Sequence, residues 1–266
     1  MSLHLFCLLS LLVFLPAHTV AQPIDSPLVL REIYAQQVDR QLVIPIQEQL
    51  LYGALLSEQL QQARLSDVAA QYVLLVDRNP YVQALLLFWI STDKSFELIG
   101  ASPISTGKVN GFEYFETPTG VFDHSTAHFD FRAEGTRNGF GIMGYGAKGM
   151  RVFDFGWVNA RRTWDDHGSS PMRFLIHATD PDRLEPLLGT ARSKGCIRIP
   201  ASLNRLLDSY GILDADYERV MVSGKRLWVL RPDRHRVQGA GRYLVVVDSK
   251  RGERPAWSPL PTKTVN

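Results

Sequence analysis

The sequence of 266 residues predicts a mainly β fold of the α+β class, preceded by a helical extension. Three observations predict it. From residue 72 onward, short apolar runs alternate with turn signals, which is typical of strands. Residues 28–65 instead carry apolar side chains at helical spacing. One further helix is predicted at residues 200–210, where leucines share one face and Gly211 supplies a C-terminal stop.

The composition is that of a folded protein with a sizeable core. Hydrophobic residues make up 45% of the chain, charged residues make up 21%, and the formal net charge is +2. No long basic run is present, so the charge pattern predicts no nucleic-acid partner.

Residues 1–21 differ from the rest of the chain and predict a secretory signal peptide. An almost wholly apolar run from Leu3 to Leu15 is followed by Pro16 and by small residues up to Ala21. The prediction is export to the periplasm or cell envelope. Because the segment contains no Lys or Arg, a retained N-terminal anchor stays open as the alternative.

The chain has two cysteines, Cys7 and Cys196. Removal of the signal segment would leave Cys196 alone. Exported proteins usually pair their cysteines in an oxidising compartment. A single thiol there is either buried and inert or reactive, and composition alone leaves both readings open.

The chain beyond residue 21 is predicted to have three parts. Residues 22–70 form the helical N-terminal extension, in which Pro45 suits the first turn of a second helix. Residues 71–235 form the main domain, and residues 236–266 form a C-terminal strand and tail. The predicted strands are Tyr72–Asp77, Tyr81–Ile90, Phe96–Ile104, Val121-Phe122, Met150–Phe155, Arg173–Ile176, Val220–Val222, Arg226–Leu230 and Tyr243–Asp248.

The residues that indicate chemistry lie between 174 and 200. His177 ends an apolar strand, and Cys196 follows 19 positions later, just before the predicted helix. A thiol becomes a good nucleophile when a base or a cation is near it. Gly195 places no side chain beside the sulfur, so the backbone N–H groups of Gly195 and Cys196 are candidate donors to an oxyanion. Lone Cys/His pairs also arise by chance, so this pattern alone does not establish an active site.

At these residues the sequence resembles the L,D-transpeptidase catalytic domain, also called the YkuD-type domain. That family has a His, a spacer of about 14–17 residues and then a Ser/Thr-x-Gly-Cys-hydrophobic-Arg/Asn motif. Here 15 residues separate His177 from Ser193, and the run Ser193-Lys194-Gly195-Cys196-Ile197-Arg198 fits the motif, with Lys194 where many members have His. Residues 105–108 and 117–120 resemble the family's "STGK" and "TPTG" loops. The resemblance covers about residues 71–230.

The resemblance implies a β-sandwich-like catalytic domain with one helix after the catalytic cysteine, and it implies no cofactor and no metal. Cys196 would attack a carbonyl of a peptidoglycan stem peptide that contains diaminopimelate and form a thioester. His177 would take the thiol proton, oriented by the backbone carbonyl of Ala178. Asp180 is a rival for this orienting role, although a turn residue before Pro181 is the favoured interpretation.

Three further residues of the motif are predicted to meet the substrate. A guanidinium holds a carboxylate with two parallel hydrogen bonds, so Arg198 is a candidate to bind a stem carboxylate. Lys194, together with Arg192, would add positive potential. Ser193 would contact the substrate or fix the loop through its hydroxyl. For each cation the alternative is a solvated surface charge.

Other features predict less. His124 and His128 are four residues apart, but no Glu accompanies them and the segment does not look helical, so no metal site is predicted. The glycine-rich stretch 139–149 lacks phosphate-binding signatures and predicts tight turns. Tyr145 and Trp157 are candidate walls of a cleft, with core packing favoured.

Three functional hypotheses follow. The first is a transpeptidase that makes or remodels wall cross-links, with a role in cell shape, or that attaches a protein to the wall as acceptor. The second keeps the Cys/His site but lets water intercept the thioester, which gives an L,D-carboxypeptidase or endopeptidase. The third is a non-catalytic wall-binding or redox-sensing protein, against which the intact His177 and Cys196 argue.

Overall fold

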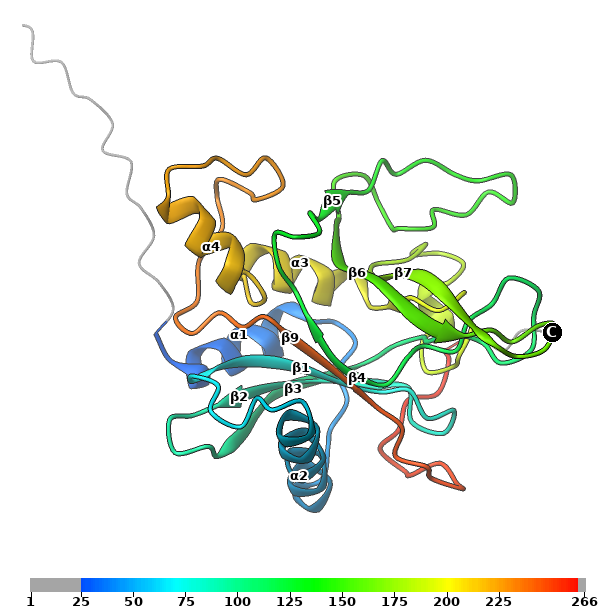
Figure 1. Cartoon of the computed structure of the whole chain (residues 1–266), viewed down its shortest axis with the longest axis horizontal. Coiled ribbons are helices and arrows are strands. Elements are labelled where there is room, and N and C mark those ends of the chain that lie inside the picture. Colours follow the sequence, from blue (N-terminus) through cyan, green and yellow to red (C-terminus); the bar gives the residue numbers. More distant parts are fainter. Residues whose placement is uncertain (1–24, 263–266) are drawn as a thin grey trace, which may run out of the picture.

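The computed structural model describes residues 25–262, so the predicted signal peptide at residues 1–21 lies outside the described residues. Two β-sheets and four α-helices form the fold (Figure 1). One sheet has five strands in the order β3-β2-β1-β9-β4, and the other has four in the order β5-β6-β7-β8. The predicted fold class, mainly β with a sandwich-like catalytic domain, is confirmed.

The elements follow the chain in this order: α1 (Pro27–Gln37), α2 (Ile46–Gln62), β1 (Gln71–Asp77), β2 (Ala84–Ile90), β3 (Phe96–Pro103), β4 (Gly120–Asp123), β5 (Phe131–Arg132), β6 (Arg151–Arg161), β7 (Ser169–His177), a 3₁₀ turn (Glu185–Leu187), β8 (Ile197–Arg198), α3 (Ala201–Tyr210), α4 (Ala215–Val222) and β9 (Tyr243–Val247). Within the described residues, no helix has the length and apolar character needed to cross a membrane.

Both faces of the five-stranded sheet are buried along β1, β2 and β9, which explains why these three strands are apolar at nearly every position. Along β1, Val73 and Leu75 face the core that α2 covers with Tyr52 and Leu56. The alternate residues Tyr72, Leu74 and Val76 face a second core, shared with α1, α3 and the four-stranded sheet. Figure 1 shows α2 on one side of this sheet and α1 and α3 on the other. The N-terminal helices therefore pack on the catalytic domain.

The strand β9 lies between β1 and β4, parallel to β1 and antiparallel to β4. Its side chains Leu244 and Val246 enter one core, and Val245 and Val247 enter the other. We therefore propose that the catalytic unit extends beyond the predicted boundary at residue 235 and includes this strand.

Two predicted strands near residues 220–230 are wrong. Residues 215–222 form α4, and residues 226–230 form turns. Valine favours strands, but Val222 is 88% exposed at the end of the helix, where no sheet edge is near enough to pair with it. The helix is instead held by the buried ring of Tyr217, which packs with Val229. Two helices, not one, thus follow Cys196.

The four-stranded sheet is larger than predicted, because β6 continues to Arg161 and β7 begins at Ser169. The register between these strands shifts between Asp154 and Trp157. Gly156 takes a φ of +80° at this bulge, and a Cβ there would lie 2.4 Å from the ring of His128. Glycine is required at this position by both the backbone angle and the contact.

Candidate active site

His177 and Arg198 lie on the same face of the four-stranded sheet, side by side in register. In β7, Phe174 and Ile176 point into the core, so His177 points to the opposite face. In β8, Ile197 enters the same core and Arg198 points away from it. The apolar alternation of the two strands therefore sets the direction of the functional side chains.

Cys196 lies one residue before β8 and is half-buried. Ile176 pairs with Ile197, so Cys196 lies opposite Leu175, two residues before His177. The spacing of neighbouring strands and the rise per residue place the Cα atoms of Cys196 and His177 roughly 8 Å apart. This separation lets the thiol and the imidazole approach each other across the pair. The thiol Sγ is 3.6 Å from the carbonyl oxygen of Arg173.

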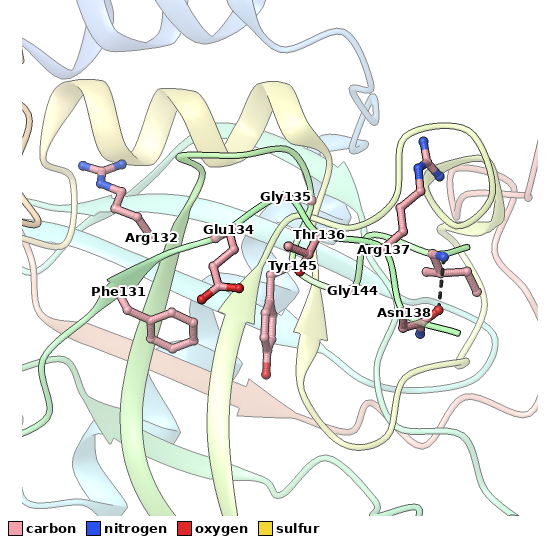
Figure 2. A pocket seen from close by; sticks show the side chains of 12 residues that line it. Phe131, Arg132, Glu134, Gly135, Thr136, Arg137, Asn138, Gly144 and Tyr145 are labelled. Atoms are coloured by element: carbon pink, nitrogen blue, oxygen red, sulfur yellow. Dashed lines mark hydrogen bonds between the residues drawn. The ribbon is translucent and has the colours of Figure 1, made fainter. Parts of the chain in front are cut away.

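The ring of His177 is oriented by the backbone. Its Nδ1 lies 2.5 Å from the carbonyl oxygen of Ala178, so Nδ1–H donates and Nε2 is the basic nitrogen. Nε2 has no hydrogen-bond partner among residues 25–262. The ring of Tyr145, which is drawn in Figure 2, meets that of His177 edge-on with 4.9 Å between centroids. This arrangement leaves one nitrogen of His177 able to accept a proton.

Asp180 does not take the orienting role. Its carboxylate is fully buried and accepts hydrogen bonds from the backbone N–H groups of Met143, Asp182 and Arg183. The favoured interpretation as a turn residue agrees with these contacts. Asp180 has a further task that the sequence did not reveal, because its bond to Met143 ties the glycine-rich loop to the segment that follows His177.

The loop that carries Cys196 is held by the two other motif segments. The backbone of Ser193 bonds to Thr106 and Lys108, and Ser105 pairs with Arg198 through two backbone hydrogen bonds. The buried hydroxyl of Thr117 donates to the carbonyl of Gly195 over 2.7 Å. The loops that the sequence marked as family-like thus serve as supports for the cysteine loop, and Thr117 is a supporting side chain that sequence reasoning did not single out.

Two predictions for the cysteine loop need correction. The N–H of Gly195 donates to Ser193 Oγ over 3.0 Å and is not free for an oxyanion. The same hydroxyl donates to the carbonyl of Cys196, so Ser193, which is only 1% exposed, fixes the loop and does not face a substrate. The N–H of Cys196, in contrast, has no partner within the part of the chain that the structure describes.

Glycine is nevertheless required at position 195. Its φ is +130°, and a Cβ would lie 2.9 Å from the Met172 side chain and 3.1 Å from Phe115. Both the backbone angle and the lack of space exclude a larger residue without a shift of the loop. The glycine therefore sets the shape of the turn that presents Cys196.

The resting pair is a neutral thiol and a neutral imidazole. Burial raises the pKa of Cys196 to about 11, although the backbone of Leu175 and the charge of Arg198 lower it. Burial lowers the pKa of His177 to about 4, against the hydrogen bond to Ala178, and the charge of Arg198 lowers it further. The thiol is therefore protonated near neutral pH, and His177 is in its basic form.

The charge of Arg198 acts on both members of the reactive pair and lowers the pKa of each. One Nη donates to the carbonyl of Arg192 over 3.2 Å, and the buried Nε has no partner among the described residues. Lys194 lies further out, where its ammonium pairs with Glu113 at 3.2 Å, both side chains being about 60% exposed. Arg198 thus has unused donors at the site, while the charge of Lys194 is partly neutralised at the rim.

The comparison with protein families shows to which family the chain belongs. The model of the L,D-transpeptidase catalytic domain matches residues 71–213, more than half of the chain. The chain belongs to this L,D-transpeptidase family. The match contains His177, Cys196 and both supporting loops.

Comparisons with whole proteins add little to the L,D-transpeptidase assignment. No curated protein matches the chain significantly. Among solved structures, the chain is similar to the helical cell shape determining protein Pgp2 from Campylobacter jejuni, with 11% identity and a TM-score of 0.28. That match covers 89% of this chain and 58% of the Pgp2 chain. The family assignment therefore depends on the domain match.

Two aromatic side chains near the candidate site of this L,D-transpeptidase family member were expected to pack in the core. Tyr145 is 42% exposed and Trp157 is 64% exposed, so neither is a core residue. Trp157 pairs with Arg173, whose carbonyl lies against the thiol of Cys196. Both aromatic residues are therefore available as walls of the site, which their hydrophobic character alone did not indicate.

Of the two histidines considered as zinc ligands, His124 and His128, the first has other partners. His124 is fully buried, with its nitrogens at 2.8 Å from Asp130 and 2.9 Å from the carbonyl of Leu213. Within the described residues, no group of three potential ligands is arranged to hold a metal ion.

Proposed function

We propose that the protein is a cysteine-dependent L,D-transpeptidase that acts on peptidoglycan stem peptides through a thioester on Cys196. The observation that supports the proposal is the register of β7 and β8, in which His177 pairs with Arg198, two residues after Cys196, and Nδ1 of His177 is bonded to the carbonyl of Ala178. The family assignment supports a peptidoglycan substrate, and diaminopimelate-containing stems are the proposed donors and acceptors.

The chemistry proceeds in two steps. In the first, the neutral imidazole of His177 takes the thiol proton as Sγ attacks the donor carbonyl. The free N–H of Cys196 is the proposed donor to the oxyanion. The protonated His177 gives its proton to the leaving amine, and the donor remains attached as a thioester. In the second step His177 activates the acceptor amine, which displaces the thiolate.

The location of the reaction is part of the proposal. An enzyme that acts on the wall must reach it, which agrees with the predicted signal peptide at residues 1–21 and export to the periplasm or cell envelope. A role in wall cross-linking and cell shape, or in attaching a protein to the wall, follows from the same chemistry with different acceptors.

Incubation with purified muropeptides, followed by mass analysis of the products, tests the proposal. We expect cross-linked or exchanged stems, together with a protein adduct at Cys196. Stems that have only been hydrolysed, with no cross-linked or exchanged product, would indicate an L,D-carboxypeptidase or endopeptidase. The absence of both products and adduct would contradict an enzymatic role.

Replacing Arg198 by Lys tests its proposed hold on a stem carboxylate. Lysine keeps the charge near Cys196 but cannot form the two-point hydrogen bond of a guanidinium. We expect kcat/KM for natural stems to fall by an amount that corresponds to a loss of about 1–3 kcal/mol in transition-state stabilisation. The rate of iodoacetamide labelling should change little. Arg192→Lys, an exposed change on the same loop, is the matched control. A parallel fall of both rates would mean that Arg198 supports the loop or the thiol.

A further inference from the structure

A cavity of about 440 Å³ is lined in part by the glycine-rich loop, including Tyr145. Its lining comes from residues 131–138 and from residues 142 and 144–146. The rings of Phe131 and Tyr145 meet at 5.5 Å and form an aromatic wall. Figure 2 shows the side chain of Glu134 on the same side of the pocket as these two rings. We call this cavity the Glu134 pocket.

Tyr145 joins the Glu134 pocket to the catalytic pair. The ring of His177 meets the ring of Tyr145 edge-on, with 4.9 Å between the ring centroids. The charge of Cys196 is among the causes that raise the pKa of Tyr145, after burial, so the thiol is also close to this tyrosine. A group bound in the Glu134 pocket is therefore adjacent to the base that must accept its proton.

The cations of the pocket are engaged elsewhere. Arg132 binds the Asp208 carboxylate and the carbonyls of Gly149 and Val229. Arg137 donates to the carbonyl of Gly141 over 2.7 Å, and in Figure 2 its side chain points away from Glu134.

Glu134 itself is exposed and has no hydrogen bond or ion pair with any described residue. Of the three charged side chains that line the pocket, Arg132, Glu134 and Arg137, Glu134 is the one without a partner among the described residues, so its carboxylate is available to attract a cationic group.

We propose that the Glu134 pocket receives the amine-bearing end of the acceptor stem, with the Glu134 carboxylate attracting its ammonium group. This inference rests on the proposed function and names the acceptor side of that site. The acceptor arrives as an ammonium and loses one proton to solvent. Its nitrogen then forms a C–N bond with the thioester carbon, the C–S bond breaks, and the second amine proton passes through His177 to Sγ of Cys196.

The test separates the two half-reactions in the full chain. A diaminopimelate-containing stem tetrapeptide serves as donor, and a stem tripeptide serves as acceptor at increasing concentration. In Glu134→Gln we expect unchanged thioester formation and an acceptor concentration for half-saturation about fivefold higher, the scale of one exposed charge pair. Hydrolysis of the thioester should compete more strongly with aminolysis. Glu253→Gln removes the same charge from an exposed position outside the pocket and should behave as the unaltered protein.

The outcomes are distinguishable. Normal thioester formation with an unchanged acceptor dependence in Glu134→Gln would overturn the inference alone. An equal effect in Glu253→Gln would also overturn it, because the charge would then act at long range and not in the pocket. Absence of a thioester in the unaltered protein would overturn the proposed function and this inference with it.

Discussion

Cys196→Ala is expected to form no thioester with a donor stem, and Cys196→Ser is expected to lose at least about 10³-fold in rate. Alanine removes the nucleophile. Serine keeps a nucleophilic atom, but a hydroxyl has a much higher pKa than a thiol. Intact-mass analysis after incubation with donor stems measures the adduct directly.

Neither change should disturb the fold. Cys196 is half-buried, and its thiol meets backbone groups of Arg173 and Leu175. The loop is held by Ser193 and Thr117, which stay in place. Thermal unfolding should therefore be close to that of the unaltered protein, and turnover by either variant at the unaltered rate would refute the thioester mechanism.

His177→Gln is expected to slow thioester formation by about 10²–10⁴-fold at neutral pH, the range for loss of a general base. The pKa of Cys196 is raised to about 11, so hardly any thiolate exists at neutral pH without a base to take the proton. The pKa of His177 is lowered to about 4, so its base form is present down to that pH. The unaltered enzyme should lose this assistance only in acid, as the pH falls through about 4.

The pH profile supplies the decisive readout. In His177→Gln the rate should rise about tenfold per pH unit from neutral pH toward pH 11, because hydroxide must now generate the thiolate. A rate in His177→Gln that is high and flat from pH 6 to 8 would show that Cys196 is already a thiolate. That result would assign the activation of the thiol to Arg198 or to the backbone, and not to His177.

Much of the fold was predictable because local pattern and burial agree. The first three strands of the larger sheet are apolar runs between turns, and the helix after Cys196 ends at Gly211, which adopts the left-handed conformation. The pattern failed at residues 220–222, where two valines of strand-favouring type, Val220 and Val222, lie at the end of a helix. It also missed the first half of β7, where Ser169, Ser170 and Pro171 carry no apolar signal and the pairing with β6 decides.

Some features of the candidate site could likewise be predicted from the sequence, and others could not. The positions of His177 and Cys196 follow from a strand end and a loop, and the carbonyl of Ala178 needs no particular side chain. The hydrogen-bond partners of individual N–H groups could not be predicted from the sequence. Ser193 and Gly195 are two residues apart, and only the conformation of the turn reveals that one satisfies the other. The Glu134 pocket was hidden because its parts come together through a loop with no periodicity.

The neighbouring strands β1 and β9 are separated in the chain by more than 160 residues, from Asp77 to Tyr243. Closing such a long loop carries an entropic cost before the contacts that repay it can form. During synthesis β1 is made long before its partner β9, and the residues of the catalytic region are made in the interval. A chain that has produced the cysteine motif but not β9 would therefore still lack an intact main sheet.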